Sequence, residues 1–259
     1  MLFPLLLVGV AAASAGDDPP SPASRPRAAP QRVLVVGNSL LRCSGVYVDS
    51  VLAKLAASAD PPVRFVTSHD YASNTTLEFH WTRRRQRVAK GTWHVVVLQE
   101  HSEVPIQAPE KLARYVRLYD ELVRKHGGRA VLLMVWPRGG KAAGRMKELE
   151  AIYASLADEL NIPVAPAGLA WELAGKERPK LKLYKDAVHP SMAGLYLNAC
   201  VLYATLTGRS PKGLGDGGLK TLHVATRTFL QNVAWQTAHG YQARHAAERQ
   251  QPDSRLASP

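Results

Sequence analysis

The hydrophobic positions of the chain fall into two kinds of segment, short apolar runs and longer stretches with helical spacing. Near-continuous runs rich in β-branched residues are typical of parallel strands that are buried on both faces. The runs that fit this description are residues 32–36, 63–67, 94–98, 130–136 and 163–167. These segments are predicted to form one five-stranded parallel sheet.

Helical segments lie between and after these runs. In residues 108–126 the side chains of Leu112, Val116 and Tyr119 share one helical face, and Gly127 follows the segment. Similar spacing predicts helices over residues 144–160, 191–206 and 219–238. Strands that alternate with helices specify a parallel sheet covered on both faces, so the predicted class is α/β, with three layers in the order α/β/α. Such sheets place their functional sites at the carboxyl ends of the strands.

The first predicted strand leads into Gly37, Asn38 and Ser39. A serine directly after a buried strand is exposed at the carboxyl edge of the sheet, close to the amino terminus of the next helix. Helix amides at that place stabilise a developing oxyanion, so Ser39 is a candidate nucleophile. A helix cap is the alternative role for the same residue, because serine is common at that position.

A second candidate motif, Asp186 and His189 followed by Pro190, precedes the predicted helix over residues 191–206. A carboxylate three residues before a histidine can lie beside the imidazole, where it fixes the tautomer and stabilises the imidazolium. The same spacing is also common in solvated turns. Because the motif follows the fifth strand, we expect it at the same sheet edge as Ser39, where the three residues are candidates for a Ser–His–Asp triad.

These two motifs resemble the first and last sequence blocks of the SGNH or GDSL hydrolases, and the resemblance covers residues 33–208. It implies the flavodoxin-like SGNH hydrolase fold. It also implies that Ser39 is the nucleophile, His189 the general base and Asp186 the acid that orients it. Asn38 stands where the family's first block usually has Asp, a difference that leaves the serine in place.

The resemblance further implies an oxyanion hole made of the Ser39 and Asn74 backbone N–H groups and one side-chain donor. Asn74 stands where the family has a glycine. The third block, residues 98–102, is similar to a divergent bacterial branch with the pattern Leu-Gln-Glu-x-Ser. Gln99 offers the amide donor of the family's asparagine on a side chain one methylene longer, whereas strict block spacing selects His101. Gln99 is the preferred donor and His101 the alternative.

The amino-terminal sequence MLFPLLLVGVAAASA has an apolar run followed by a small-x-small site, as in a secretory signal peptide. It predicts cleavage after Ala15 and a secreted or periplasmic protein. The predicted organisation is then a flexible tether over residues 16–31, one hydrolase-like domain over 32–245 and a disordered tail over 246–259. No apolar run reaches the length of a transmembrane helix. Whether Cys43 and Cys200 pair is left open by the sequence.

Lysine and arginine number 33 against 21 aspartate and glutamate, a formal net charge of +12. Basic stretches at residues 83–90 and 176–185 would attract an anionic substrate if they rim the site, and otherwise form a solvated cationic face. Nucleic-acid binding is disfavoured by the signal peptide and by the lack of a recognised module. The glycine-rich segment 213–218 is expected to be a loop, and no zinc or nucleotide motif implies a metal or cofactor.

The sequence therefore predicts a secreted or periplasmic serine esterase that removes acetyl or another short acyl group, with a carbohydrate or small-molecule ester as substrate and no nucleic-acid partner. Two alternatives remain at this stage. One is a catalytically silent SGNH-like domain that binds an anionic envelope polymer, and the other is an extracytoplasmic O-acyltransferase. The oligomeric state, the acyl length and the leaving group are not defined by the sequence.

Overall fold

The computed structural model describes residues 29–136 and 144–250. The predicted signal peptide, nearly all of the predicted tether and residues 251–259 lie outside the described residues. In the part of the chain that is described, no helix has both the length and the apolar character needed to cross a membrane.

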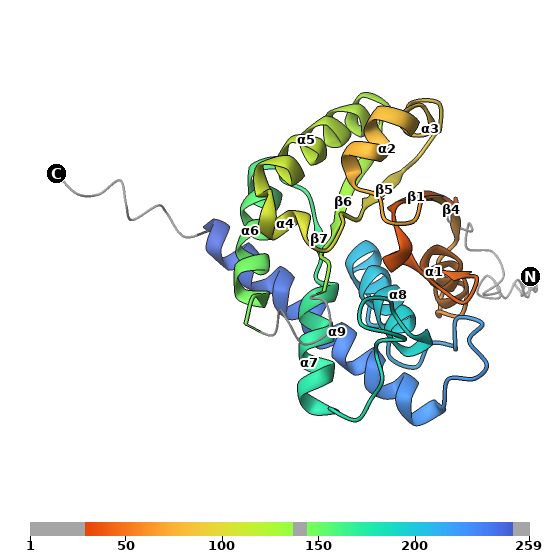
Figure 1. Ribbon diagram of the computed structural model, residues 1–259. Helices are drawn as coiled ribbons and strands as arrows, with labels where there is room; N and C mark the ends of the chain where they lie inside the picture. Colours follow the sequence, from red (N-terminus) through yellow and green to blue (C-terminus); the bar gives the residue numbers. More distant parts are fainter. Residues whose placement is uncertain (1–28, 137–143, 251–259) are drawn as a thin grey trace, which may run out of the picture.

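Five parallel strands form the central sheet in the order β4-β1-β5-β6-β7, which is the flavodoxin-like order. This confirms the predicted α/β class with a five-stranded parallel sheet between helices (Figure 1). The strands are β1 (Gln31–Gly37), β4 (Phe65–Tyr71), β5 (Val95–Leu98), β6 (Arg129–Leu133) and β7 (Val164–Ala165). A separate two-stranded hairpin, β2 (Arg42–Cys43) with β3 (Val46–Tyr47), follows the first strand.

The position of β1 inside the sheet brings three strand ends together. Gly37 at the end of β1 pairs with Tyr71 at the end of β4, and Val36 pairs with Leu98 at the end of β5. Because all three strands run in the same direction, the segments that follow them start side by side at one edge of the sheet. The three segments contain Ser39 and the residues expected to form the oxyanion hole, whereas Asp186 and His189 come from the loop before α8.

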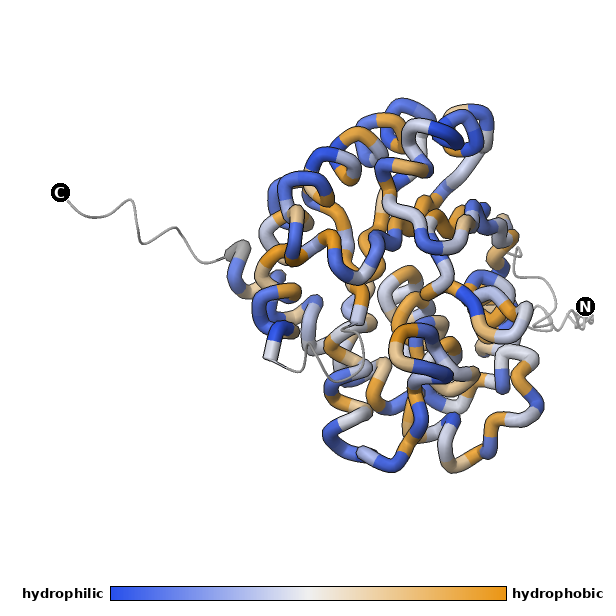
Figure 2. The backbone as a smooth tube through the Cα atoms, viewed as in Figure 1, coloured by the Kyte–Doolittle hydropathy of each residue, from blue (hydrophilic) through white to orange (hydrophobic). Residues whose placement is uncertain are grey.

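Helices cover both faces of the sheet (Figure 1). One layer contains α1 (Val48–Ala57), α7 (Ala167–Glu177), α8 (Met192–Thr207) and α9 (Val224–Gln250). The other contains α2 (Leu77–Arg84), α3 (Gln86–Ala89), α5 (Pro109–Lys125) and α6 (Met146–Leu160), with the short α4 (Val104–Gln107) against α5. Figure 2 shows hydrophobic positions concentrated where these layers meet the sheet and hydrophilic positions on the outer surfaces.

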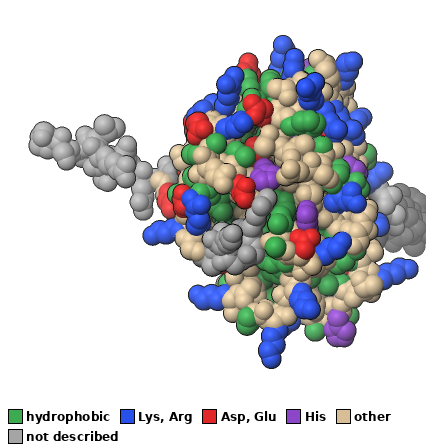
Figure 3. Space-filling model, in the orientation of Figure 1, with side chains coloured by type: hydrophobic (Ala, Val, Ile, Leu, Met, Phe, Trp, Pro, Cys, Tyr) green, Lys and Arg blue, Asp and Glu red, His purple; other side chains and the backbone are tan. Residues whose placement is uncertain are grey.

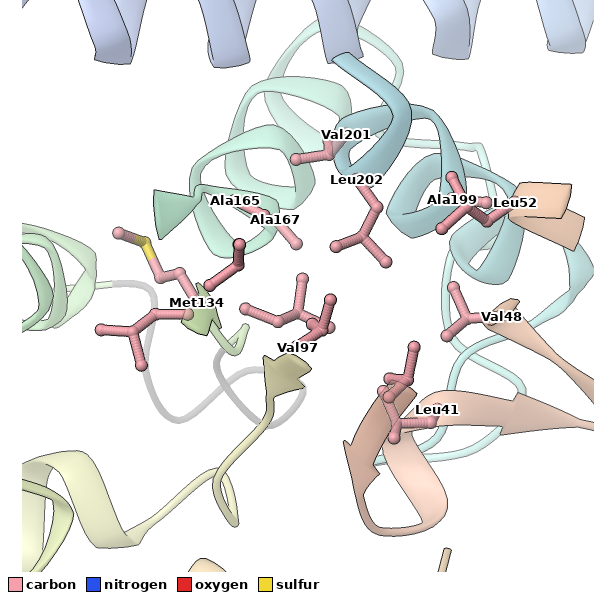
Figure 4. Packing of buried hydrophobic residues seen from close by; sticks show 14 of the residues in the cluster. Leu41, Val48, Leu52, Val97, Met134, Ala165, Ala167, Ala199, Val201 and Leu202 are labelled. Atoms are coloured by element: carbon pink, nitrogen blue, oxygen red, sulfur yellow. The ribbon is translucent and has the colours of Figure 1, made fainter. Parts of the chain in front are cut away.

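Helix α8 is the most deeply buried helix described, because every residue from Ala193 to Leu206 is buried. It lies between the sheet and α9. Figure 4 shows Val201 and Leu202 of α8 facing the strand side chains Val97 and Ala165. Burial of this kind stabilises a fold by roughly 25 cal/mol per Å² of apolar surface. The loop before α8 is therefore attached to a rigid part of the molecule.

The structure differs from the sequence-based expectation at several element ends. Strand β4 runs to Tyr71 rather than ending at residue 67, because this edge strand pairs only with β1 and carries partly exposed polar residues that an apolar template does not detect. Strand β7 is two residues long, since Ala167 already begins α7. Helix α9 begins at Val224 and continues through Gln250, so residues 246–250 are helical and the predicted tail begins too early.

Candidate active site

Ser39 is held at the carboxyl end of β1 by a tight turn. Asn38 caps the short 3-10 helix Ser39–Leu41, and its Oδ1 accepts the backbone N–H of Leu40 at 3.1 Å. Gly37 before it has no room for a side chain, because a Cβ there would collide with Gln99 Oε1. The turn leaves Ser39 partly exposed at the sheet edge, while Leu40 and Leu41 are buried beneath it.

The loop of Asp186 and His189 is closed by its own backbone. Lys185 N–H donates to the carbonyl of His189 at 2.9 Å, and Ser191 N–H donates to the carbonyl of Leu183 at 2.7 Å. Ser191 then caps α8 by accepting the N–H of Gly194. These bonds fix the loop to the buried helix α8 and so fix the position of the imidazole.

The structure brings Ser39, His189 and Asp186 together. Ser39 Oγ lies 3.0 Å from His189 Nε2, and His189 Nδ1 lies 2.9 Å from Asp186 Oδ2. Distances of this size are those of a nucleophile hydrogen-bonded to its base and a base hydrogen-bonded to its acid. The side chains of His189 and Asp186 are 40% and 51% exposed, so the site opens directly to solvent.

Asp186 is kept ionised by its own loop. Its Oδ1 accepts the backbone N–H groups of His189 and Val188, each at 2.8 Å. Together with the imidazole, these donors lower the pKa of Asp186 to about 2. An ionised carboxylate at this place holds the His189 proton on Nδ1, which directs the basic Nε2 toward Ser39.

Asn74 lies in the loop after β4 with a left-handed backbone, φ 53°. Glycine adopts this conformation most readily and asparagine is one of the residues that tolerate it. The loop is held from behind, since Asn38 Nδ2 donates to the carbonyl of Thr75 at 2.8 Å. Thr75 Oγ1 also lies 3.0 Å from Nε2 of the fully buried His80, whose Nδ1 lies 3.2 Å from Asp70 Oδ2. The Asp70–His80 pair, which supports the loop, could not be predicted from the sequence.

Gln99 does not occupy the place expected of an oxyanion donor. Its side chain is 1% exposed, its Oε1 accepts the N–H of Asn38 at 2.9 Å, and its Nε2 donates to the carbonyl of Glu100. Both ends of the amide are thus used to fix the backbone behind Ser39. This corrects the preferred assignment of Gln99, whose role in the structure is to hold the serine turn.

His101, the alternative donor, lines the same hollow as Ser39 and Asn74. The backbone N–H of Glu103 donates to His101 Nδ1 at 3.4 Å. A neutral imidazole that accepts at Nδ1 carries its proton on Nε2, so the neutral tautomer of His101 that fits this contact is an Nε2–H donor. Spacing from the end of β5 identifies this residue, but only the backbone turn shows that His101 rather than Gln99 faces the hollow.

Glu100 is a buried residue to which the sequence analysis assigned no role. Its Oε1 accepts the N–H of His101 at 2.6 Å, and both carboxylate oxygens lie within 3.3 Å of the N–H of Leu77 at the start of α2. Burial raises the pKa of Glu100 to about 7, although these hydrogen bonds act in the opposite direction. The Glu100 carboxyl group therefore joins the loop of Asn74 to the loop of His101.

Two hollows meet at Ser39 and His189. One, of about 400 Å³, is lined by neutral groups that include Leu40, Asn74 and Val188. The other, of about 370 Å³, contains Arg42, Lys185 and Asp186. Of the two basic stretches in the sequence, the one at residues 83–90 lines neither hollow, whereas Lys185 from the second lines one of them. Figure 3 shows lysine and arginine side chains distributed around the visible face of the molecule.

Within residues 29–136 and 144–250, no group of three His, Cys, Asp or Glu side chains is arranged to hold a metal ion. Both cysteines are free thiols in the structure. Cys43 lies in the second hollow, whereas Cys200 is fully buried in α8.

Comparison with solved structures shows which proteins have a similar fold. A protein assigned to the SGNH hydrolases from Slackia heliotrinireducens shares 25% sequence identity over 68% of this chain and 98% of its own, with a TM-score of 0.55. A DUF4886 family protein from Bacteroides uniformis matches 80% of this chain and 94% of its own at 16% identity and a TM-score of 0.67. An acetylxylan esterase from Geobacillus stearothermophilus matches 68% of this chain and 94% of its own, at 14% identity and a TM-score of 0.57.

The fold of this chain is the SGNH hydrolase fold, which it shares with these solved structures. No protein-family model matches the sequence, and a comparison with curated proteins finds no match. The likeness to known proteins therefore rests on the fold.

Proposed function

We propose that this protein is an extracytoplasmic serine esterase that hydrolyses short acyl esters, with acetyl esters of carbohydrates as its substrates. The observation that carries the proposal is the continuous hydrogen-bonded chain from Ser39 Oγ through His189 to Asp186, with separations of 3.0 and 2.9 Å. The ester-hydrolase class has further support from the solved SGNH-type neighbours.

In the first half of the reaction, Ser39 Oγ attacks the ester carbonyl while His189 Nε2 accepts the serine proton. Asp186 stabilises the imidazolium that forms. The tetrahedral intermediate then collapses, the bond between the carbonyl carbon and the alcohol oxygen breaks, and His189 returns the proton to the departing alcohol. In the second half, water replaces the alcohol, and the same steps in reverse order release the carboxylic acid and restore Ser39.

The negative oxygen of each intermediate needs donors on the side of the 400 Å³ hollow. We assign this role to the backbone N–H groups of Ser39 and Asn74 and to Nε2–H of His101. Loss of one such donor in serine hydrolases lowers kcat by about 10²- to 10³-fold. The left-handed backbone of Asn74 supports the assignment, because it matches the conformation available to the glycine of the family's second block.

A carbohydrate acetate is the substrate we favour, since structural neighbours include proteins described as acetyl xylan esterases. The exposure of His189 and Asp186 also suits a site that must accept a large, hydrophilic alcohol. The leader-like sequence before Gly16 supports export, and the mass of the mature protein from an exporting host tests this, with Gly16 as the expected first residue.

Labelling with a fluorophosphonate and hydrolysis of p-nitrophenyl acetate test the proposal together. The wild type is expected to carry the label on Ser39 and to turn over the ester, whereas Ser39→Ala and His189→Ala should lose at least about 10³-fold in kcat. Ser210→Ala is a matched control, because Ser210 lies in the loop after α8 and lines neither hollow. A wild type that neither labels nor turns over any ester contradicts the proposal and favours a binding domain.

Transfer to an acceptor is distinguished by its products. If addition of a sugar alcohol diverts the acyl group from water to the sugar without slowing release of p-nitrophenol, the protein is an acyltransferase. Release of acetate alone identifies a hydrolase.

A further inference from the structure

Arg42 and Lys185 lie in the hollow of about 370 Å³ that contains Ser39 and His189. Arg42 comes from β2, directly after the serine turn, and Lys185 comes from the loop of the catalytic acid and base. Two segments that are far apart in the sequence thus each bring one positive charge to the same side of the nucleophile.

Neither cation has an acidic partner in the described parts of the chain, residues 29–136 and 144–250. The one carboxylate that lines this hollow is Asp186, and its oxygens are already used by two backbone N–H groups and by His189. By contrast, Arg84 is paired with Asp70 and Lys111 with Glu78. The charge on this side of Ser39 is therefore available to a ligand.

Arg42 is also held in place. Its guanidinium lies 5.6 Å from the ring centre of Tyr47 and 5.3 Å from that of Tyr71. Tyr47 in turn stacks on His69 with 3.8 Å between the ring centres. A guanidinium supported on aromatic rings has lost part of its freedom before any ligand arrives, and its planar donors match an oxyanion of a carboxylate or phosphate.

The two hollows differ in a way that assigns them to the two halves of an ester. The 400 Å³ hollow has the proposed oxyanion donors and the apolar Leu40 and Val188, which suit a carbonyl with a short acyl group. The 370 Å³ hollow shares Ser39 and His189 with it and has the two cations, which the first hollow lacks. The alcohol must leave past His189, which lines both hollows, so the cationic hollow is available to the alcohol.

We propose that Arg42 and Lys185 form a subsite for an anionic group, a carboxylate or a phosphate, on the alcohol half of the ester. This inference rests on the proposed esterase function and narrows its substrates to acylated anionic alcohols. The subsite selects the substrate by charge and raises the local concentration of anionic esters around Ser39.

The test uses three acetyl esters that differ in the para group of the phenol: 4-acetoxybenzoate, 4-acetoxyphenyl phosphate and the neutral 4-acetoxybenzamide. For each enzyme we take the ratio of kcat/KM for an anionic ester to kcat/KM for the neutral one. This ratio does not depend on the fraction of enzyme that is folded, and comparison between enzymes cancels the different reactivities of the esters.

Relative to wild type, we expect this ratio of kcat/KM values to be lower by about 5-fold in Lys185→Gln and by about 10-fold in Arg42→Gln. The reason is that one partly exposed ion pair is worth on the order of 1 kcal/mol. Arg42→Lys keeps the charge and should retain part of the preference. Raising the ionic strength from about 0.02 M to about 0.5 M should lower the wild-type ratio toward that of the variants.

Arg83→Gln is the matched control, because Arg83 is exposed on α2 and lines neither hollow, and its ratio should equal that of wild type. If the substitutions lower the ratio for only one of the two anionic esters, the carboxylate or the phosphate, that ester identifies which anion the subsite binds. Equal ratios in wild type, Arg42→Gln and Lys185→Gln overturn the subsite while leaving the esterase intact. No turnover of any of the three esters overturns the esterase proposal itself.

Discussion

Glu100 Oε1 accepts the backbone N–H of His101 at 2.6 Å, while the same carboxylate reaches the N–H of Leu77 at the start of α2. One buried side chain therefore links the loop after β5 to the loop after β4. Both loops contribute a proposed oxyanion donor. The protonation state of Glu100 therefore affects the geometry of the proposed oxyanion hole and the stability of the fold.

Because the Glu100 carboxyl group is buried, we expect the free energy of unfolding to fall as the pH rises. Burial raises the pKa of Glu100 from 4.5 to about 7, so between these pH values the native state keeps a proton that the unfolded state has released. Because the native state binds more protons, its free energy of unfolding decreases across this range, by about 3 kcal/mol for a fully buried carboxyl, and is constant with respect to this group above pH 7.

Urea unfolding of wild type and Glu100→Gln at several pH values between 4 and 8 measures this contribution. The neutral amide cannot ionise, so the variant should lack the fall in stability and should gain on wild type as the pH increases. Glu121→Gln, an exposed change on α5, is the control and should follow wild type. If the free energy of unfolding depends on pH in the same way in wild type and Glu100→Gln, the Glu100 carboxyl group does not keep its proton in the native state, and the prediction is wrong.

Asp186→Asn should lower kcat without unfolding the protein. The asparagine carbonyl can still accept the N–H groups of Val188 and His189, but its NH₂ then faces His189 Nδ1 and favours the wrong tautomer. Because the site is open to water, we expect a loss of about 10²- to 10³-fold, measured as kcat for p-nitrophenyl acetate. Asp216→Asn is a matched control, since Asp216 Oδ1 also accepts a backbone N–H, that of Gly218, in a surface loop.

His101 and Gln99 should respond differently to substitution. His101→Ala removes a donor to the oxyanion and should lower kcat by about 10²-fold with little change in Tm. Gln99→Leu leaves the N–H of Asn38 without its acceptor inside the protein, which should destabilise the fold by about 1–3 kcal/mol. Thermal unfolding and kcat measured on the same samples separate the two effects. A large loss of kcat in His101→Ala with a matching loss of Tm would assign His101 a structural role instead.

Asn74→Gly should keep activity within about 3-fold, because the proposed donor is the backbone N–H and glycine adopts a positive φ at little cost. Asn74→Val places a β-branched residue in the same conformation, which costs on the order of 1–2 kcal/mol and shifts the loop. We expect kcat for p-nitrophenyl acetate to fall clearly in Asn74→Val and not in Asn74→Gly. Equal losses in both variants would show that the Asn74 side chain itself acts in the site.

The sequence predicted the elements that are buried on all sides and was less successful at the edges of the sheet. Strands β1 and β5 and helix α8 consist of apolar runs, because each is covered by neighbours on both faces. Strand β4 contains Ser68, His69 and Asp70, since an edge strand with partial solvent exposure does not need an apolar sequence. A helix was expected directly after Ser39, but α1 begins only at Val48, and the helical spacing of its buried Val48, Val51, Leu52 and Leu55 could have shown its bounds.

The residues of the candidate site also divide into those whose positions the sequence predicts and those whose positions it does not. The positions of Ser39, Asp186 and His189 are set by where strand β1 ends and where helix α8 begins, and the sequence predicts both. The choice between Gln99 and His101 depends on how the backbone turns after Leu98, which a residue pattern does not encode. The role of Glu100 depends on Leu77, which is 23 residues away in the chain and adjacent only after folding.

Ser39 and His189 are 150 residues apart in the sequence, and they meet in the structure because the loop before α8 is tied to that buried helix. A growing chain that has completed the first strand already carries the proposed nucleophile, but the proposed base reaches it only when the loop before α8 is in place. On the proposed mechanism, a product of synthesis that ends before His189 lacks the base and should not hydrolyse esters. Acquisition of the proposed activity would then report that α8 has packed into the core.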